Sequence, residues 1–330
     1  MKKVSLFALL ITTLSLQMYA KTIIPHSLKP GSKIALITPA TVTDSVPVLK
    51  AMEMLRERGY QPVLMPHALT RDWGTHPATP EVRATEIMAA FADPTVDAIL
   101  CTRGGYGCNQ LLPLLSDSLI KSNPKWLIGY SDISALHAYM NNLGIASIHG
   151  PMTGHMAKYG QQDPALQYEF DILERGLPVT YKVDGSKYNI PGTARGTLIG
   201  GNMLVLNGLA QTPWDMLSLG LQGRDVILAI EDVSEKIYAI ERVLVRLHQS
   251  GALRAVKGII VGRFSDYGPD ATFDTMEDMI SFWLTRWGYE IPVAFGFPMG
   301  HLDENNYPLV ISAEATLTVD PHSVTLTMRK

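Results

Sequence analysis

Short apolar runs alternate with longer amphipathic stretches along the first half of the chain, beginning at Lys33. The short runs are rich in β-branched and aliphatic residues, and the longer stretches repeat apolar residues at helical spacing. This alternation is typical of βαβ units and predicts a parallel sheet. In chain order the pattern predicts strand 33–38, helix 46–58, strand 61–65, helix 80–92, strand 98–102, strand 126–130 and a helix directly after Ser131-Asp132.

The pattern weakens between residues 155 and 195, where Gly, Pro, Lys and Asp replace regular apolar spacing. Such a composition is typical of a connection between domains. We therefore expect an N-terminal domain over 21–160, a linker over 161–195 and a C-terminal domain over 196–330. Beyond the linker the pattern predicts strands at 196–200, 226–230, 258–264 and 291–295, helices at 202–209 and 276–287, and a hairpin within 309–328.

The first twenty residues have the pattern of a secretory signal peptide. Lys2 and Lys3 precede an apolar run, Val4–Leu16, and a short polar stretch ends at Ala20. The run is shorter than the ~20 residues that a spanning helix needs. We expect removal of residues 1–20, export to the periplasm and no stable membrane insertion afterwards; an uncleaved anchor is the alternative.

The charge balance indicates a small polar ligand and excludes a nucleic-acid partner. Lys and Arg number 28 against 31 Asp and Glu, and no basic run exceeds two residues, so the electrostatic footprint of a nucleic-acid binder is missing. Cys101 and Cys108 are the two cysteines, and their spacing matches no zinc site. The expected metal content is therefore none, and whether the two thiols form a disulfide stays open.

Ser131 is the first candidate for chemistry. It lies where a predicted strand breaks sharply into a helix, and a serine in such a turn presents its hydroxyl above the sheet beside the next backbone amide. The usual G-x-S-x-G pattern is incomplete, because Gly129 is present and Ile133 replaces the second glycine. The alternative is that Ser131 or Asp132 merely caps the helix.

The segment Arg103-Gly104-Gly105-Tyr106-Gly107 follows a predicted strand and is the second candidate. Its glycines let backbone amides approach a ligand closely. A dinucleotide site does not fit, because Gln110 replaces the third glycine of that motif. The segment predicts either a turn that holds an anion or oxyanion, or a tight structural turn.

Two further candidates lie in the predicted C-terminal domain. Glu231 ends an apolar strand, where ligand sites of α/β sheets gather, although it could equally be a solvated charge. Its neighbour Asp232 has capping-box spacing with Glu235 ahead of a long amphipathic helix, so we interpret it as the helix cap. His301 follows a strand in a turn, and histidine is the usual general base near neutral pH.

These segments together resemble the LD-carboxypeptidases, also called muramoyltetrapeptide carboxypeptidases, from about Lys33 to the end of the chain. The resemblance rests on the segments Arg103-Gly104-Gly105-Tyr106-Gly107, Gly129-Tyr130-Ser131-Asp132, Gly200-Gly201-Asn202, Glu231-Asp232 with Ile240-Glu241-Arg242, and Gly300-His301. It implies an α/β fold with a flavodoxin- or amidotransferase-like parallel-sheet domain, a smaller C-terminal α/β domain and assembly as a homodimer.

The resemblance also implies the roles of individual residues. Ser131 would be the nucleophile, His301 its base and Glu231 the residue that orients the histidine. Backbone amides of Gly105 and Asp132 would form the oxyanion hole. No cofactor is implied. For the free carboxylate of a substrate, the nearest sequence candidates are Arg103 and the amide of Gly104.

The expected activity is removal of terminal D-alanine from murein tetrapeptides. Well-known family members act in the cytoplasm, whereas this chain carries an apparent signal, so nascent or intact peptidoglycan is the expected source of substrate. Two alternatives stay open: an immunity peptidase of the same fold that cleaves peptide-nucleotide antibiotics, and a muropeptide-binding protein without turnover. The first would need an aromatic platform for the base, which the sequence does not locate.

Overall fold

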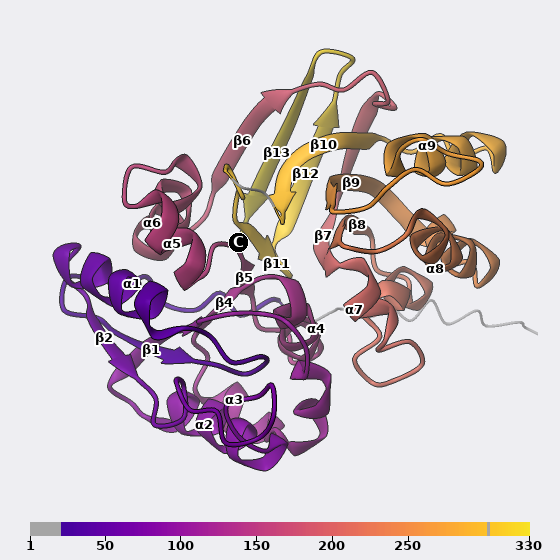
Figure 1. The fold of residues 1–330 in the computed structure, drawn as a ribbon. Coiled ribbons are helices and arrows are strands. Elements are labelled where there is room, and N and C mark those ends of the chain that lie inside the picture. The colour runs from indigo at the N-terminus through magenta and orange to yellow at the C-terminus, as the bar shows by residue number, and fades with distance from the viewer. Residues whose placement is uncertain (1–20, 302–303) are drawn as a thin grey trace, which may run out of the picture.

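The computed structural model describes residues 21–301 and 304–330, so the expected signal segment, 1–20, lies outside the described residues. The N-terminal part forms a six-stranded sheet of order β11-β5-β4-β3-β1-β2, drawn mostly in indigo and magenta in Figure 1. Neighbouring strands from β5 to β2 are parallel, as expected, and β11 is antiparallel to β5. The strands are β1 (Lys33–Ile37), β2 (Gln61–Leu64), β3 (Val96–Cys101), β4 (Trp126–Gly129), β5 (Ser147–His149) and β11 (Leu309–Ile311).

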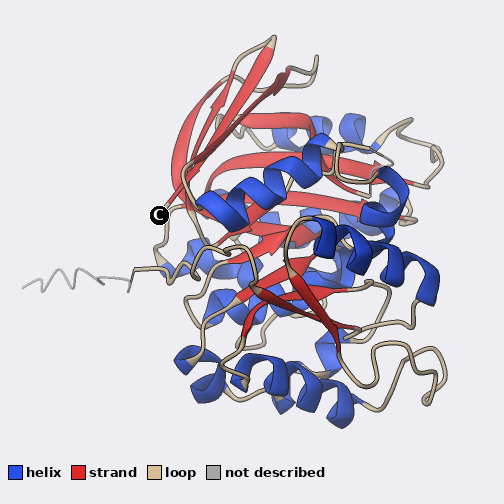
Figure 2. Ribbon diagram, turned by 90° about the vertical axis from the view of Figure 1, so that its left-hand side faces the viewer, coloured by secondary structure: helices blue, strands red, loops and turns tan. Residues whose placement is uncertain are grey.

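Helices cover both faces of this sheet (Figure 2). Its central strands are therefore buried on both sides, which explains why β3 and β4 read as continuous apolar runs rather than as alternating ones. The predicted helix over 80–92 is confirmed in its full range. The helices of this part are α1 (Ser45–Glu57), α2 (Pro80–Ala92), α3 (Asp117–Ser122) and α4 (Ser134–Asn142).

A second sheet of seven strands has the order β10-β9-β8-β7-β12-β13-β6. Its first four strands are parallel, and the remaining pairs are antiparallel. The yellow hairpin of β12 and β13 lies beside β6 in Figure 1 and confirms the predicted tail hairpin. The strands and helices are β6 (Val179–Asp184), β7 (Gly192–Asn202), β8 (Val226–Val233), β9 (Val256–Ser265), β10 (Val293–Gly300), β12 (Glu314–Val319), β13 (Ser323–Arg329), α7 (Met203–Asn207), α8 (Ile237–Gln249) and α9 (Met276–Arg286).

The stretch expected to be a linker, 161–195, is instead structured. It contains helix α6 (Pro164–Arg175) and strand β6, which follow α5 (Thr153–Tyr159). Asp163 caps α6 by accepting a hydrogen bond from the Leu166 amide, and Pro164 starts the helix. α6 has 12 residues and buries Leu166, Phe170 and Leu173 at helical spacing, so its period is present in the sequence. The Gly, Pro and Asp residues on both sides of the helix gave the whole stretch the composition of a loop.

Two further expectations about the C-terminal part need correction. Strand β11, from the predicted hairpin region, joins the first sheet rather than the second. Asp232 does not cap α8, because strand β8 continues through Val233 and Lys236 precedes the helix. The Asp232 carboxylate instead accepts a hydrogen bond from the Leu204 amide in α7, at 2.8 Å. Within the described residues, no helix is both long and apolar enough to cross a membrane.

Candidate active site

Ser131 lies in a sharp turn just beyond the carboxyl end of β4. Its φ is 67°, a left-handed value that non-glycine residues rarely adopt and that costs about 1–3 kcal/mol. It begins a short 3-10 turn, Ser131–Ile133, that leads into α4. His137 supports the approach to this turn, because its Nε2–H donates to the Gly129 carbonyl oxygen at 2.8 Å. The serine is therefore held in a strained backbone conformation, as at a nucleophile elbow.

The glycine loop packs directly against this turn. A Cβ atom at Gly104 would lie 2.7 Å from the Ser131 Cβ and 3.2 Å from the Asp132 amide nitrogen, so a larger residue would displace the nucleophile. The Asp132 carboxylate accepts a hydrogen bond from the Cys108 amide at 2.8 Å. Asp132 thus joins the turn to the end of the loop, and neither it nor Ser131 caps the helix as the alternative interpretation proposed.

Glu231 lies near the carboxyl end of β8, and its side chain is fully buried. Gly300, at the end of β10, makes room for it: a Cβ there would lie 2.7 Å from Glu231 Oε2. This contact explains why a glycine precedes His301. Because β8 and β10 are both neighbours of β9, their carboxyl ends meet at one edge of the sheet.

His301 lies between the other two side chains. Its Nδ1 is 2.7 Å from Glu231 Oε2, and its Nε2 is 3.0 Å from Ser131 Oγ. An ionised carboxylate can only accept, so Nδ1 carries the proton and Nε2 is free to accept the serine hydroxyl hydrogen. The three residues predicted from distant parts of the sequence therefore come together in one hydrogen-bonded row.

The electrostatics of this row favour a charged glutamate. Burial would raise the pKa of Glu231, but the hydrogen bond and charge of His301, together with the nearby His149, lower it to about 2. Burial also opposes protonation of His301, yet Glu231 and the charges of Asp232 and Asp266 raise its pKa above the ordinary value. Tyr130, whose ring lies edge-on to His301 at 5.0 Å, stays neutral because burial raises its pKa to about 12.

Hydrogen bonds also join the two sheets next to the row. Ser134, at the start of α4, accepts a hydrogen bond from the Asn202 amide at 2.9 Å. Asn202, at the end of β7, donates from its side chain to the Asp232 carboxylate at 2.9 Å. These contacts hold the nucleophile turn against the sheet that carries Glu231.

Two cavities flank the row. The larger, of about 980 Å³, lies on the His301 side, and the smaller, of about 350 Å³, lies on the Ser131 side. The larger is lined by polar and aromatic residues that include Tyr130, Arg263, Asp266, Tyr267, Glu277 and Glu304. The smaller is lined by Gly105, Tyr106, Asn109, Ser131, Asp132 and Asn202, among others.

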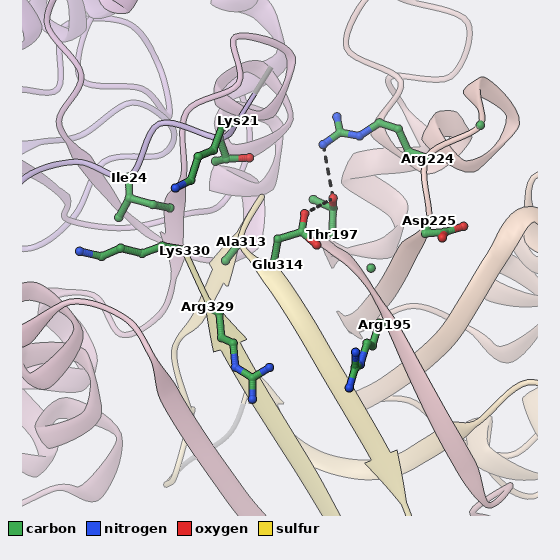
Figure 3. A pocket seen from close by; sticks show the side chains of 13 residues that line it. Lys21, Ile24, Arg195, Thr197, Arg224, Asp225, Ala313, Glu314, Arg329 and Lys330 are labelled. Carbon is green, nitrogen blue, oxygen red and sulfur yellow. Dashed lines mark hydrogen bonds between the residues drawn. The ribbon is translucent and has the colours of Figure 1, made fainter. Parts of the chain in front are cut away.

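Figure 3 shows a third cavity, of about 440 Å³, whose lining includes none of the three residues of the row. In it Thr197 lies between Arg224 and Glu314 and hydrogen-bonds to both. Along β7 and β8, Thr197 pairs with Val226 and Asn202 with Glu231. The third cavity is therefore at the opposite end of these strands from the candidate active site.

Comparison with known proteins agrees with this geometry. The profile of LD-carboxypeptidase N-terminal domains matches residues 34–150, and that of LD-carboxypeptidase C-terminal domains matches residues 195–317. The chain belongs to the LD-carboxypeptidase family. It is therefore a serine-type carboxypeptidase.

Individual LD-carboxypeptidases resemble most of the chain. Murein tetrapeptide carboxypeptidase of Pseudomonas aeruginosa is 30% identical over 285 residues, covering 83% of this chain and 89% of that protein. The structure of muramoyltetrapeptide carboxypeptidase from Oxalobacter formigenes matches with a TM-score of 0.79 and 28% identity, over 91% of this chain and 99% of that one. Microcin C7 self-immunity protein MccF of Escherichia coli is 28% identical over 295 residues, covering 80% and 83%. The expected two-domain α/β fold is confirmed.

Some of the other predicted site residues of this LD-carboxypeptidase lie beside Ser131, and one does not. Gly105 and Asp132, predicted for the oxyanion hole, both line the smaller cavity together with Ser131. Gly104 approaches the serine side chain itself. Arg103 donates to the Val42 carbonyl oxygen at 3.0 Å, and it does not occur among the described residues lining either flanking cavity.

Sequence reasoning missed two kinds of site residue. Arg263 lies on β9 and lines the larger cavity, but an isolated cation at the end of a strand carries no motif. Arg83 is buried in α2, where it donates to the Pro39 and Gly107 carbonyl oxygens and so supports the glycine loop. A charged residue on the apolar face of a predicted helix was the available signal.

Proposed function

We propose that this protein removes the terminal D-alanine from murein tetrapeptides by hydrolysing the bond between an L-centre and D-Ala. The observation that carries the proposal is the His301 ring, which lies within hydrogen-bonding distance of both Ser131 Oγ and Glu231 Oε2. The names of the Pseudomonas and Oxalobacter relatives support the substrate class.

In the proposed reaction, His301 Nε2 takes the Ser131 proton while Oγ attacks the carbonyl carbon of the scissile bond. Amides of Gly105 and Asp132 donate to the resulting oxyanion, each contributing ~3 kcal/mol. The intermediate collapses, and the D-alanine amine leaves with the proton from His301. A water molecule then gives a proton to His301 and attacks the acyl carbonyl carbon. As the second tetrahedral intermediate collapses, the bond to Oγ breaks, His301 returns the proton to Ser131 Oγ, and the shortened peptide leaves with a free carboxylate. Glu231 stabilises the imidazolium in both steps.

The larger cavity can hold the charged groups of such a peptide. Arg263 supplies a cation for a substrate carboxylate, and Asp266, Glu277 and Glu304 supply anions for an amino group. Arg103 and the Gly104 amide are the candidates that the sequence offered for the terminal carboxylate. Replacing Arg263 and Arg103 separately by Gln, and comparing KM for the tetrapeptide, decides which cation holds it.

The proposed setting is the periplasm, with the protein assembled as a homodimer and acting on nascent or intact peptidoglycan. The support is the pattern of residues 1–20 and, for the dimer, the family resemblance. Intact-mass measurement of protein from the cell envelope should find a chain that begins near Lys21. Retention of Met1 would favour an anchor, and recovery only from cytosol would remove the export proposal.

The decisive experiment compares two peptides. Tetrapeptide ending in the L-centre-to-D-Ala bond should lose alanine, and pentapeptide ending in D-Ala-D-Ala should be spared. Inverting the acyl-side residue exchanges its side chain and hydrogen, which moves the carbonyl away from Ser131, and ~1 Å of misplacement can cost ~100-fold. Chromatography with mass detection of released alanine measures both rates. Faster cleavage of the pentapeptide would reject the proposed selectivity and leave the serine mechanism standing.

A second candidate is cleavage of peptide-nucleotide compounds, as the relationship to MccF suggests. Solved MccF structures contain aspartyl sulfamoyl adenosine or glutamyl sulfamoyl guanosine. In this chain Tyr130 and Tyr267 line the larger cavity and could provide the aromatic platform that the sequence did not locate. Assaying aspartyl sulfamoyl adenosine beside the tetrapeptide separates the candidates: a higher kcat/KM for the nucleotide would favour this one.

A further inference from the structure

A second histidine faces the glutamate of the proposed triad. His149 ends β5 in the first sheet, and its ring is fully buried. Its Nε2 lies 3.8 Å from Glu231 Oε1. This is the glutamate oxygen that His301 does not use, because His301 contacts Oε2.

Both groups lack the partners that buried polar atoms usually have. Within the described residues, neither ring nitrogen of His149 nor Oε1 of Glu231 has a hydrogen-bond partner. Leaving such atoms unpaired in the interior is costly, and native proteins keep few of them. At 3.8 Å, no water molecule fits in line between the two atoms. A direct interaction is therefore the remaining way to pair His149 Nε2 with Glu231 Oε1.

The other titratable groups around the His149 ring do not compete for it. The rings of Tyr130 and His137 lie 6.0 and 6.1 Å away. Burial, followed by His149 itself, lowers the pKa of His137 to about 3, so His137 is neutral. Glu169 lies beyond Gly150, and burial followed by Asp163 raises the pKa of this carboxyl well above its ordinary value. The facing anion is therefore Glu231.

The two partners come from different sheets, so their separation depends on how the sheets meet. His149 belongs to the six-stranded sheet, and Glu231 belongs to the seven-stranded one. Gly201 of the second sheet lies next to the ring, since a Cβ there would be in van der Waals contact with His149 Cδ2, at 3.4 Å. An approach of about 1 Å would bring Nε2 and Oε1 within hydrogen-bond range.

We propose that His149 is a positioning residue for Glu231: its Nε2–H donates to Oε1 when the two atoms approach each other across the boundary between the two sheets. The inference rests on the proposed triad and adds a fourth member. With both oxygens held, the carboxylate does not rotate, and Oε2 stays aligned with His301 Nδ1. The contact also joins the carboxylate of the proposed triad, on the second sheet, to a residue of the first sheet.

Three variants test this role. His149→Phe keeps an aromatic ring and removes the donor, whereas His149→Gln keeps an amide donor. His155→Phe is the matched control, because His155 is also a buried histidine of the first domain but pairs with Asp163. The first readout is the rate constant for labelling of Ser131 by a fluorophosphonate, followed by mass spectrometry. It depends on activation of the serine and not on recognition of a peptide.

We expect His149→Phe to slow the labelling by about tenfold to 100-fold, the range that small misplacements of reacting groups produce. His149→Gln should stay within about threefold of the wild type, and His155→Phe should match the wild type. With tetrapeptide, the Phe variant should lower kcat and leave KM within about twofold. Because the rate constant is read from the time course, it does not depend on how much of a variant folds.

Equal slowing by Phe and Gln, or labelling of the Phe variant at the wild-type rate, would overturn the proposal. Failure of the proposed function looks different: the wild-type protein would then label at Ser131 but release no alanine from the tetrapeptide. If the wild type does not label at all, the triad itself is wrong, and His149 has no triad to position.

Discussion

The two sides of the candidate active site are built in different ways. The serine side, residues 103–108 and 129–134, comes from the loops after the adjacent strands β3 and β4. Packing against Gly104 and the Asp132–Cys108 hydrogen bond hold Ser131 in its strained conformation. The carboxylate side, Glu231 and His301, comes from β8 and β10 of the other sheet. One side is therefore assembled within a domain, and the complete site exists only where the domains meet.

The serine side is preorganised within one domain, whereas the carboxylate side must be aligned with it across the domain boundary. On the serine side, the close packing of Gly104 fixes where the nucleophile and the neighbouring amides lie. On the carboxylate side, His301 must span from Glu231 to a serine in another domain, at 2.7 and 3.0 Å. We expect changes on the serine side to act through geometry, and changes on the carboxylate side to act through charge and pH dependence.

The largest expected effects come from removing one group on each side. Ser131→Ala should lower kcat by about 10⁶-fold, because loss of the nucleophile leaves only binding and the oxyanion hole. Glu231→Gln keeps the shape but removes the charge that stabilises protonated His301, and should cost about 10⁴-fold. Steady-state rates on tetrapeptide, with circular dichroism to verify folding, measure both. Turnover of Ser131→Ala at the wild-type rate would reject the mechanism.

A smaller effect should follow from filling the space above the serine. Gly104→Ala would place a methyl group 2.9 Å from Ser131 Oγ and 3.2 Å from the Asp132 amide. We expect kcat to fall by about 10²- to 10³-fold, as when one oxyanion donor is lost. Gly154→Ala is the control, because nothing lies within 4 Å of the added Cβ. If both variants keep wild-type kcat, the glycine loop does not shape the oxyanion site.

The pH dependence should distinguish the two sides. The general base must be neutral, so kcat/KM should fall about tenfold per pH unit below the pKa of His301. Burial opposes protonation, but Glu231 raises this pKa above the ordinary 6.5. The acid limb should therefore lie above pH 6.5 in the wild type and in Gly104→Ala, and move to lower pH in Glu231→Gln. An unchanged limb in Glu231→Gln would mean that another group controls it.

The sequence predicted the serine side better than the way in which the two sides meet. The sequence predicted strand β4, the turn at Ser131 and the glycine loop because their signals are local. These signals are an apolar run, an abrupt end to that run and closely spaced glycines. The composition of the stretch that contains α6 and β6 predicts a linker, because the glycines and prolines around these elements outweigh the helical period of α6. The Asp232 contact to α7 was missed for a different reason. Capping-box spacing is a local rule, whereas this carboxylate pairs with an amide 28 positions away.

No pattern in the sequence predicted that His149 faces Glu231. These residues belong to different sheets, and no spacing rule joins residues across a domain boundary. The triad assignment itself came from family resemblance rather than from periodicity. Patterns in the sequence thus identified the strand ends that carry the candidate catalytic residues. The packing of the two sheets sets the distances between these residues.

The smallest expected change concerns the two cysteines, which test how closed the serine side is. Cys101 ends β3 and Cys108 follows the glycine loop; both are buried and unpaired thiols. Burial raises the pKa of Cys101, and burial together with Asp132 raises that of Cys108. Because the thiolate is the reactive form, native protein at pH 8 should react negligibly with iodoacetamide.

Unfolding in guanidinium should expose two reactive thiols, and intact-mass measurement should show both as free. The two cysteines flank the glycine loop in the sequence, and both are buried, so protection of their thiols from the reagent reports whether the serine side opens. Labelling of native protein as fast as unfolded protein would show that this side opens readily and is not preorganised. If the thiols are labelled only after unfolding, and the reagent leaves kcat on tetrapeptide unchanged, the serine side is closed and preorganised. Any motion within the candidate site then lies at the boundary between the two domains.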